Sequence, residues 1–525
     1  MIATSAAYKA AVTGDKRKTL VRAVVDLISP DIVYGAATSS GESTYSQSAQ
    51  LHDKITELSE PYITLEQNRW LLDGTWELAP PKSGAQVGYE SDELSGADGT
   101  CNIWVQLNFS GVTVLQACSL YFPTDDYNGY PVNFTVEIYS GATAAYTQTF
   151  EGNANRVIKL TGFTVSNPTA IRLTVTVMSL PYRRLRVPEI IAGVYEIWGN
   201  DELAGFAIAQ KADLAAVSVP YGTCRLTINN ADKRFSPRNK SGLFLSLEER
   251  QGIQTYIGFD GAEYVPTGTY YQYSGGWSTA GSGLTMDWSL VDIIGLLASR
   301  KYPTTGTLPI TLEEWVASCV ALLGTNFAGK YRLDSGIDGT RETLATAGMI
   351  EGATCGQILM WICQIVGCYM MADNSTGELV LTKAAPTGNE YTLNNLSRYP
   401  AEKANGDIAS ITISLNPDSS SVATFAGTGN ASPTSISIDN PFVWTSGDVQ
   451  TAATAIAAYI LQSFGGNQIE TIGRGDPSSE LGDTATVQFA DGETEQGRIV
   501  AQDYKLTGGV MRDCKTTMIE IQGGE

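Results

Sequence analysis

The sequence has very little histidine: His52 is the only one among 525 residues. Most hydrolase triads and histidine-rich zinc sites need this side chain as a base or a ligand, so its scarcity removes them. Glutamate, aspartate or lysine can also act as a general base, so catalysis as such stays open. We expect His52, which stands in the polar stretch 51–54, to be a surface residue. The sequence also contains no G-x-S-x-G, H-E-x-x-H or P-loop motif.

Charge is scarce as well, because charged residues make up only 17% of the chain, and no lysine and arginine run of the kind that marks a nucleic-acid patch occurs. The net charge of -21 would repel nucleic-acid phosphates, so we expect no direct nucleic-acid partner. The longest apolar runs, such as 358–371, are broken by polar residues, so we expect no membrane span. The N-terminus lacks the basic and apolar segments of a secretion signal, which predicts synthesis and assembly in a cytoplasm.

The eight cysteines form no C-x-x-C pair. Cys355, Cys363 and Cys368 fall in or near an apolar helical pattern, which favours small core residues over a metal cluster. Without metal-ligand spacing or a secretion signal, we expect reduced thiols. We therefore predict that the protein holds no metal and no cofactor.

What the chain does have is length, 43% hydrophobic residues and 53 glycines. This length predicts two to four domains, and the many turns suit an all-β architecture. Short β-rich segments separated by Gly, Asn, Asp or Pro recur between about 100 and 180, and this spacing is typical of a sandwich or jelly roll. Further strands are expected at 216–219, 225–229, 254–259, 268–273 and 283–290.

Helices are expected mainly in the second half of the chain. The apolar periodicity predicts helices near 309–325, 355–370 and 448–464, and Thr311 is placed to cap the first of them. A short helix should follow Asp292. The sequence therefore predicts a mainly β fold with α+β elements.

Acidic residues offer the remaining candidates for chemistry. Adjacent pairs such as Asp125-Asp126 and Glu313-Glu314 do not make a glycosidase site, because neighbours on a strand point to opposite faces and a helix start explains the second pair. Glu90, Asp92, Glu93 and Asp98 are expected in a solvated acidic loop. Such a loop could hold calcium, but its spacing does not match an EF-hand.

Aromatic residues gather at the expected loops of the first β-rich region. Trp76, Tyr89, Tyr127 and Tyr130 are the candidates for contacts with a glycan, because sugar faces stack on aromatic rings. The alternative is that they are core residues or contacts between subunits, where tyrosine is enriched.

Two motifs carry a family resemblance. Gly475-Asp476-Pro477-Ser478-Ser479-Glu480-Leu481-Gly482-Asp483, followed by an alternating strand at 484–489, resembles the closing module of tail hub proteins from tailed bacteriophages. The segment 221–237, which ends in Arg234-Phe235-Ser236-Pro237, resembles the first barrel of these hubs. The resemblance implies two similar β-barrel modules, with helical elaborations.

A second resemblance covers about 60–195. The strand Asn102-Ile103-Trp104-Val105-Gln106-Leu107-Asn108-Phe109 and the segment 181–193 resemble discoidin-like (coagulation factor 5/8 C-type) jelly rolls, and 65–74 with 88–99 resembles the entry to such domains. The two resemblances together imply five parts. These are an N-terminal segment with the first strand of the hub barrel (1–58), an inserted discoidin-like β-sandwich (59–195), the first hub barrel continued (196–300), an α+β middle domain (301–400) and a second hub barrel with the helix 448–464 (401–525).

The hub resemblance implies a structural virion protein without enzymatic activity, placed in the virion tail after assembly in the host cytoplasm. It implies a homo-oligomer, namely a trimer, at the tail tip. The implied partners are a distal tail or tail tube protein, a tape measure protein, and tail fibre or receptor-binding proteins. A host-surface carbohydrate-binding tail protein is the alternative, and a tail-associated cell-wall hydrolase is the second alternative.

Overall fold

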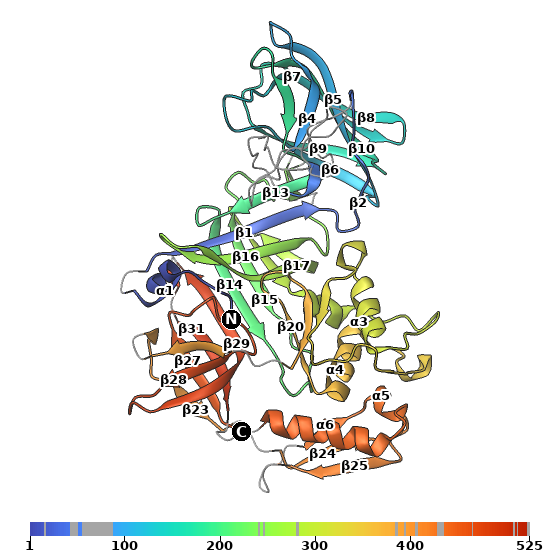
Figure 1. The fold of residues 1–525 in the computed structure, drawn as a ribbon, viewed down its shortest axis with the longest axis vertical. Coiled ribbons are helices and arrows are strands. Elements are labelled where there is room, and N and C mark those ends of the chain that lie inside the picture. Colours follow the sequence, from blue (N-terminus) through green and yellow to red (C-terminus); the bar gives the residue numbers. More distant parts are fainter. Residues whose placement is uncertain are drawn as a thin grey trace, which may run out of the picture. The chain divides into compact units, whose positions relative to one another are not determined.

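The structure is a computed structural model that describes most of the chain. The described residues are 1–14, 17–41, 51–54, 88–239, 242–244, 247–279, 283–383, 387–392, 395–404, 408–427, 435–464, 466–507, 510–511 and 513–521. Strands dominate and a few helices accompany them, which confirms the predicted mainly β fold with α+β elements (Figure 1). Every helix within these ranges is too short or too polar to cross a membrane.

The chain forms two compact units. Unit 1 comprises Met1–Val24, Ile197–Ala231 and Gly252–Glu525, and unit 2 comprises Val25–Glu196 and Asp232–Gln251. Because strands β1 (Thr19–Ile28) and β13 (Gly193–Trp198) contain the points of division, both belong partly to each unit.

A fourteen-stranded sheet runs through unit 1. Its main path is β13-β1-β16-β17-β18-β15-β14-β29-β31-β27-β23. The further strands of this path are β14 (Leu203–Lys211), β15 (Thr223–Asn229), β16 (Gly252–Phe259), β17 (Tyr264–Thr279), β18 (Thr285–Val291), β23 (Ala401–Lys403), β27 (Gln468–Gly473), β29 (Thr494–Thr507) and β31 (Cys514–Glu520). Off the path, β22 (Thr387–Tyr391) pairs with β28 (Thr484–Gln488), β28 also pairs with β29, and β30 (Val510–Met511) pairs with β29.

Alternating burial explains why these segments form strands. Every second residue of β15, β18 and β28 is buried, as expected for strands with one face on a core. Strand β14 pairs antiparallel with β15 on one side and with β29 on the other. It therefore joins the strands from the middle of the chain to those near its C-terminal end.

One predicted strand is wrong, because 216–219 is not a strand. The carboxylate of Asp213 accepts hydrogen bonds from the backbone amides of Ala215, Val217 and Ser218, at 2.7 to 3.1 Å. Ala216 has a positive φ of 51° inside the resulting turn. A local side-chain to backbone network thus replaces the sheet hydrogen bonds that the apolar sequence suggested.

The helices of the described chain lie in unit 1, and two of them begin where the sequence predicted. The helices are α1 (Ala6–Thr13), α2 (Ile293–Ser299), α3 (Leu312–Ala321), α4 (Cys355–Val366), α5 (Pro441–Trp444) and α6 (Val449–Phe464), with 3-10 turns at Thr325–Phe327 and Ala347–Met349. Thr311 caps α3 through a capping box with Glu314, and Asp292 caps α2. Cys319, Cys355, Cys363 and Cys368 lie in the buried apolar cluster around α3 and α4, which confirms that they are core residues.

Two small sheets accompany these helices. One has the order β19 (Tyr331–Leu333), β21 (Leu379–Thr382), β20 (Tyr369–Ala372), and the other β25 (Val422–Ala426), β24 (Ser410–Ser414), β26 (Ser435–Ile438). Helix α6 lies along the second sheet (Figure 1). Its residues Ile456 and Ile460 share a buried cluster with Ile411 and Ile413 of β24.

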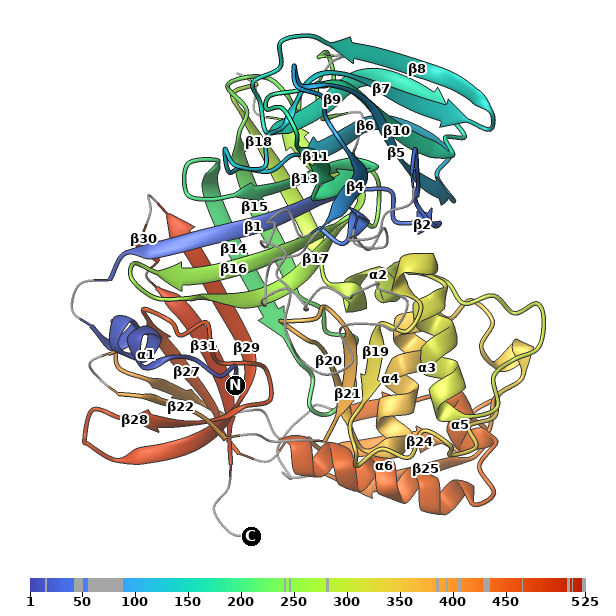
Figure 2. The same ribbon diagram turned by 45° about the horizontal axis from the view of Figure 1, so that its top comes forward.

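Unit 2 is a β-sandwich (Figure 2). One sheet has the order β2 (Val33–Tyr34), β5 (Thr100–Ser110), β10 (Ala170–Met178), β7 (Pro131–Ser140), β8 (Thr143–Phe150), with β3 (Thr38–Ser39) also on β5. The other has the order β12 (Glu189–Ile191), β6 (Val114–Tyr121), β9 (Val157–Ser166). One buried cluster takes residues from both sheets, such as Leu107 and Leu120. A further pair joins β4 (Tyr89–Leu94) to β11 (Arg184–Val187).

Candidate functional site

The motif Gly475–Asp483 lies in unit 1, where other parts of the chain hold its polar groups. The guanidinium of Arg17 donates hydrogen bonds to the carbonyls of Arg474 and Gly475, at 2.8 and 2.9 Å. The phenol of Tyr504 donates to the carbonyl of Asp476 at 2.9 Å, and Ser478 donates to its carboxylate at 2.7 Å. The motif is therefore fixed from several directions, as expected of a structural clamp rather than of a mobile loop.

The glycines of this motif are required by its geometry. Gly475 and Gly482 have positive φ angles of 71° and 85°, which disfavour any residue with a Cβ. A Cβ at Gly482 would overlap the hydroxyl oxygen of Tyr369, and a Cβ at Gly475 would lie 2.8 Å from the Cβ of Cys514. The Asp483 carboxylate, which is fully buried, accepts hydrogen bonds from the amide of Glu480 at 2.9 Å and the amino group of Met1 at 2.7 Å.

A pocket of about 560 Å³ lies beside this clamp, between α1 and strands of the C-terminal part. Its lining includes Tyr8, Val12, Arg17, Tyr391 and Cys514. This volume lies in the range of pockets that take small ligands, and a partner's side chains could also occupy it. Burial raises the pKa of the Tyr8 phenol well above its ordinary value, so this hydroxyl stays protonated and can act as a donor.

The four predicted aromatic candidates occupy different environments. Trp76 lies outside the described residues. Tyr89 is only 2% exposed and packs in the core of unit 2, so it offers no contact surface. Tyr130 is half-buried, with the guanidinium carbon of Arg156 3.3 Å from the centre of its ring. Tyr127 is 69% exposed and remains a candidate for contacts.

The structure adds neighbours to Tyr127 that were not among the predicted candidates. Arg183 donates a 2.9 Å hydrogen bond to the Tyr127 carbonyl, and its guanidinium carbon lies 5.0 Å from the centre of the Tyr127 ring. Tyr182 is 60% exposed and has a positive φ of 54°, an uncommon conformation for a bulky residue. Together with exposed Leu94, which is paired with Arg184 across β4 and β11, these residues form what we call the tyrosine patch.

The expectation of a solvated acidic loop at Glu90 is wrong. Glu90 lies on β4, is only 6% exposed, and forms a salt bridge of 3.0 Å with Arg186 on β11. The Nε atom of Arg184 lies 3.6 Å from a carboxylate oxygen of Glu90. Asp92, Glu93 and Asp98 are exposed. The acidic residue at position 90 is thus an internal counter-ion of two arginines.

His52 is half-buried, and its ring stacks on that of Tyr34 with 4.0 Å between the ring centres. Burial lowers the pKa of its imidazole, which favours the neutral form.

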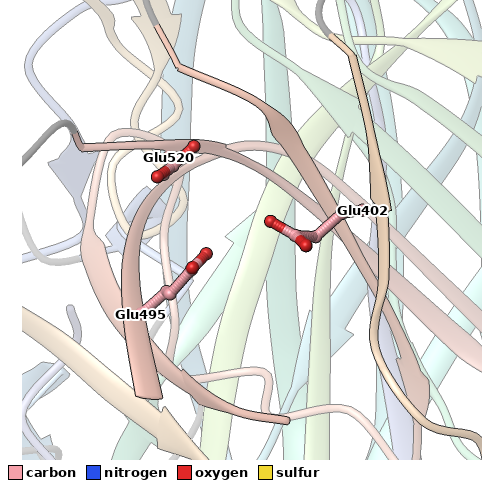
Figure 3. A group of neighbouring side chains, drawn as sticks. All are labelled: Glu402, Glu495 and Glu520. Carbon is pink, nitrogen blue, oxygen red and sulfur yellow. The ribbon is translucent and has the colours of Figure 1, made fainter. Parts of the chain in front are cut away.

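Three carboxylates converge on one part of the large sheet (Figure 3). Glu402 of β23, Glu495 of β29 and Glu520 of β31 offer oxygen atoms that lie within 4.8 Å of one another. Burial raises the pKa of Glu495, and the charges of Glu402 and Glu520 raise it further. Exposed acidic groups often gather without an ion, so we assign no metal site to this cluster and describe it as a place of mutual repulsion.

The comparisons with known proteins concern structure only. No model of a protein family matches the chain, and no curated protein matches it. Similar solved structures include the 43 kDa tail protein of prophage MuSo2 from Shewanella oneidensis, with 17% identity over 62% of this chain and 95% of that one and a TM-score of 0.40. A tail protein from Neisseria meningitidis MC58 has 13% identity over 62% and 94%, with a TM-score of 0.42. Prophage tail protein gp18 from Listeria monocytogenes EGD-e has 13% identity over 63% and 92%, with a TM-score of 0.38.

Proposed function

We propose that the protein is a structural component of a phage-type tail and acts as the hub at the tail tip. In this role it joins the tail tube to fibres, a spike or receptor-binding parts. The observation that carries the proposal is the continuous sheet of unit 1, in which β14 and β29 pair over six residues, from Phe206 with Leu506 to Lys211 with Ala501.

A continuous sheet suits a part that transmits force. Backbone hydrogen bonds link strands from distant parts of the chain, so a load on one strand reaches the next without passing through a flexible linker. The clamp at Gly475–Asp483 adds to this, because it is built from side chains near the two ends of the described chain, such as Arg17 and Tyr504. The residues that resemble tail hubs therefore stabilise a scaffold, and we assign no enzymatic activity.

The proposed partners follow from this role. Copies of the chain form a ring, a trimer in the arrangement that the sequence resemblance implies, and the ring contacts a distal tail or tail tube protein, a tape measure protein, and fibre or receptor-binding proteins. The net charge of -21 opposes nucleic-acid binding. The sandwich of unit 2 would be the inserted discoidin-like jelly roll predicted over 59–195, and the protein would reside in the virion tail.

Negative-stain microscopy of the purified full chain tests the proposal. Particles with a central ring and cyclic symmetry are the expected result, because a hub assembles from identical copies. Images that contain only single 525-residue chains, at concentrations high enough to populate a stable interface, would overturn it.

A second candidate function rests on the tyrosine patch. Tyr127 exposes its ring beside the guanidinium of Arg183, and Tyr182, the residue before Arg183, is exposed as well. Such aromatic rings can stack on sugar faces. We propose host-glycan binding as the function of this surface. The full chain should be retained on host cell-wall glycan, and a variant with both Tyr127→Ala and Tyr182→Ala should lose retention at an unchanged melting temperature. Equal retention of the variant and the parent protein would exclude the tyrosine patch as the glycan-binding surface.

A further inference from the structure

Strand β8 is the outermost strand of the larger sheet in unit 2. Figure 2 shows it at the edge of that sheet, next to β7. It pairs with β7 from Phe150 to Thr143, with a register shift at Ala145 that leaves Phe150 to Tyr146 as the regular part, and within the described residues no strand pairs with its other side. An outer strand of eight residues presents a row of backbone donors and acceptors to any chain that can lie beside it.

The composition of β8 lacks the features that usually protect such an edge. Its sequence, TAAYTQTF, contains no charged residue and no proline. Other outer strands of the described chain are shorter or carry charge. Strand β12 has three residues, β23 carries Glu402 and Lys403, and the ten-residue β9 carries Lys159. Strand β8 is therefore suited to accept a further strand.

The hydrogen-bond pattern shows which backbone groups of β8 are free for such a strand. The amide of Phe109 on β5 donates to the carbonyl of Thr169, at the start of β10. The backbone amides and carbonyls of successive residues point to alternate sides of a strand. When this alternation is followed from β5 through β10 to β7, the amides and carbonyls of Phe134 and Val136 point toward β8. Their partners Phe150 and Gln148 face β7 in return, so the amides and carbonyls of Thr147 and Thr149 point away from it.

The side chains of β8 favour a copy of the same strand. Thr147 and Thr149 are exposed on one face of the sheet, and the Thr149 hydroxyl lies 3.1 Å from that of Thr135 on β7. In an antiparallel pair of two β8 strands, threonine faces threonine or alanine on this face, and such pairs stabilise neighbouring strands. The chain as a whole is acidic, with a net charge of -21, and β8 adds no like-charge repulsion at such a contact because it carries no charged residue.

We propose that β8 pairs antiparallel with β8 of a second copy of this chain, about a two-fold axis, so that the two sheets become one. The contact goes beyond the proposed hub role, since a two-fold contact cannot close a three-membered ring. It would instead link copies that belong to different rings.

Substitutions at Thr147 test the pairing. Because the Thr147 amide does not bond to β7, Thr147→Pro removes a donor from the free edge while leaving the sheet intact. Thr147→Lys places a charge at the centre of the contact and serves as a second variant. Thr164→Lys is the matched control, because Thr164 is an exposed threonine on β9 of the other sheet.

Analytical ultracentrifugation of the full chain over a concentration series is the measurement. We expect a reversible association that both Thr147 variants weaken at least tenfold and that Thr164→Lys leaves unchanged. Hydrogen exchange should also show that the amides of Thr147 and Thr149 become protected as the concentration rises. Equal association of parent and Thr147 variants, or rapid exchange of these amides at every concentration, would overturn the proposal.

The hub proposal fails separately from this one. Loss of the ring with retention of a Thr147-dependent dimer would contradict the hub alone. A ring that persists in all four proteins, with no further association that depends on Thr147, would contradict the β8 contact alone.

Discussion

The guanidinium of Arg17 donates a 2.9 Å hydrogen bond to the carbonyl of Gly475, which lies 458 residues further along the chain. The same group donates to the Arg474 carbonyl, and its carbon lies 4.1 Å from the centre of the Phe259 ring. Burial lowers the pKa of Arg17 to about 10, so the side chain still carries its charge at neutral pH. One arginine thereby fastens the N-terminal segment to the motif that resembles tail hubs.

Replacing this arginine should loosen unit 1. Arg17→Met keeps much of the apolar stem but leaves two carbonyls without their charged donor, so we expect a loss of about 2 kcal/mol in the free energy of unfolding. Urea denaturation measures it. Lys18→Met is the control, because Lys18 is exposed and its change should stay within about 0.5 kcal/mol. Equal stabilities of the two variants would contradict the clamp.

The glycine at position 482 should tolerate no side chain. Gly482→Ala forces a Cβ against the Tyr369 hydroxyl at a φ of 85°, whereas Gly492→Ala has a φ of 90° with no atom within 4 Å of the new Cβ. Both variants bear the cost of placing an alanine at a positive φ, so the difference between their free energies of unfolding measures the overlap with Tyr369. We expect Gly482→Ala to be less stable than Gly492→Ala by about 1 to 3 kcal/mol in urea denaturation. The absence of a difference would show that Tyr369 moves freely.

The buried salt bridge between Glu90 and Arg186 should behave unlike an exposed one. Arg186→Met leaves the Glu90 carboxylate without its nearest counter-ion, and we expect unit 2 to lose about 3 kcal/mol. Adding Glu90→Gln to this variant should recover part of the loss, because the buried charge is then gone. The control is Arg225→Met. The Arg225 side chain is 64% exposed in its salt bridge with Asp287, so we expect a loss below about 1 kcal/mol in the free energy of unfolding. Denaturant unfolding distinguishes these outcomes when it is followed in unit 2 for the Arg186 and Glu90 variants and in unit 1, which contains Arg225 and Asp287, for the control.

The carboxylate cluster should make stability depend on pH. The pKa of Glu495 is raised by burial and then by Glu402 and Glu520, so its ionisation weakens the folded state. This cost is absent below the ordinary pKa, grows as pH rises through that value, and is complete above the raised pKa. Glu495→Gln should therefore raise the melting temperature at about pH 7 and change it little at about pH 3.

Exposed Glu351 supplies the control for this measurement. Glu351→Gln should leave the melting temperature nearly unchanged at both pH values. If Glu495→Gln lowered the melting temperature at neutral pH, the carboxylate would be stabilising, and an interaction other than repulsion would dominate at this site.

Local signals predicted the elements well, and tertiary contacts account for the errors. The cap at Thr311 could be recognised because a capping box depends on residues three apart. The turn at 216–219 was missed because Asp213 competes for the backbone amides just beyond it. Glu90 looks like a solvated residue in the sequence, since its partner Arg186 comes close only when β4 and β11 pair.

The candidate sites were less accessible to sequence reasoning. Tyr127 was identified as an exposed aromatic residue, but Tyr182 and Arg183 join it only through the folding of unit 2. The conformation of Tyr182, with its positive φ, has no sequence signature. Glu402, Glu495 and Glu520 come from three strands, and only the order β29-β31-β27-β23 brings them together.

The most direct test of the central claim is the mass of the full chain in solution, measured by mass photometry over a range of concentrations. The hub predicts a discrete species at a fixed multiple of the 56.1 kDa subunit, and this species should persist in the Thr147→Pro variant. A single peak at the subunit mass at every concentration would contradict the account.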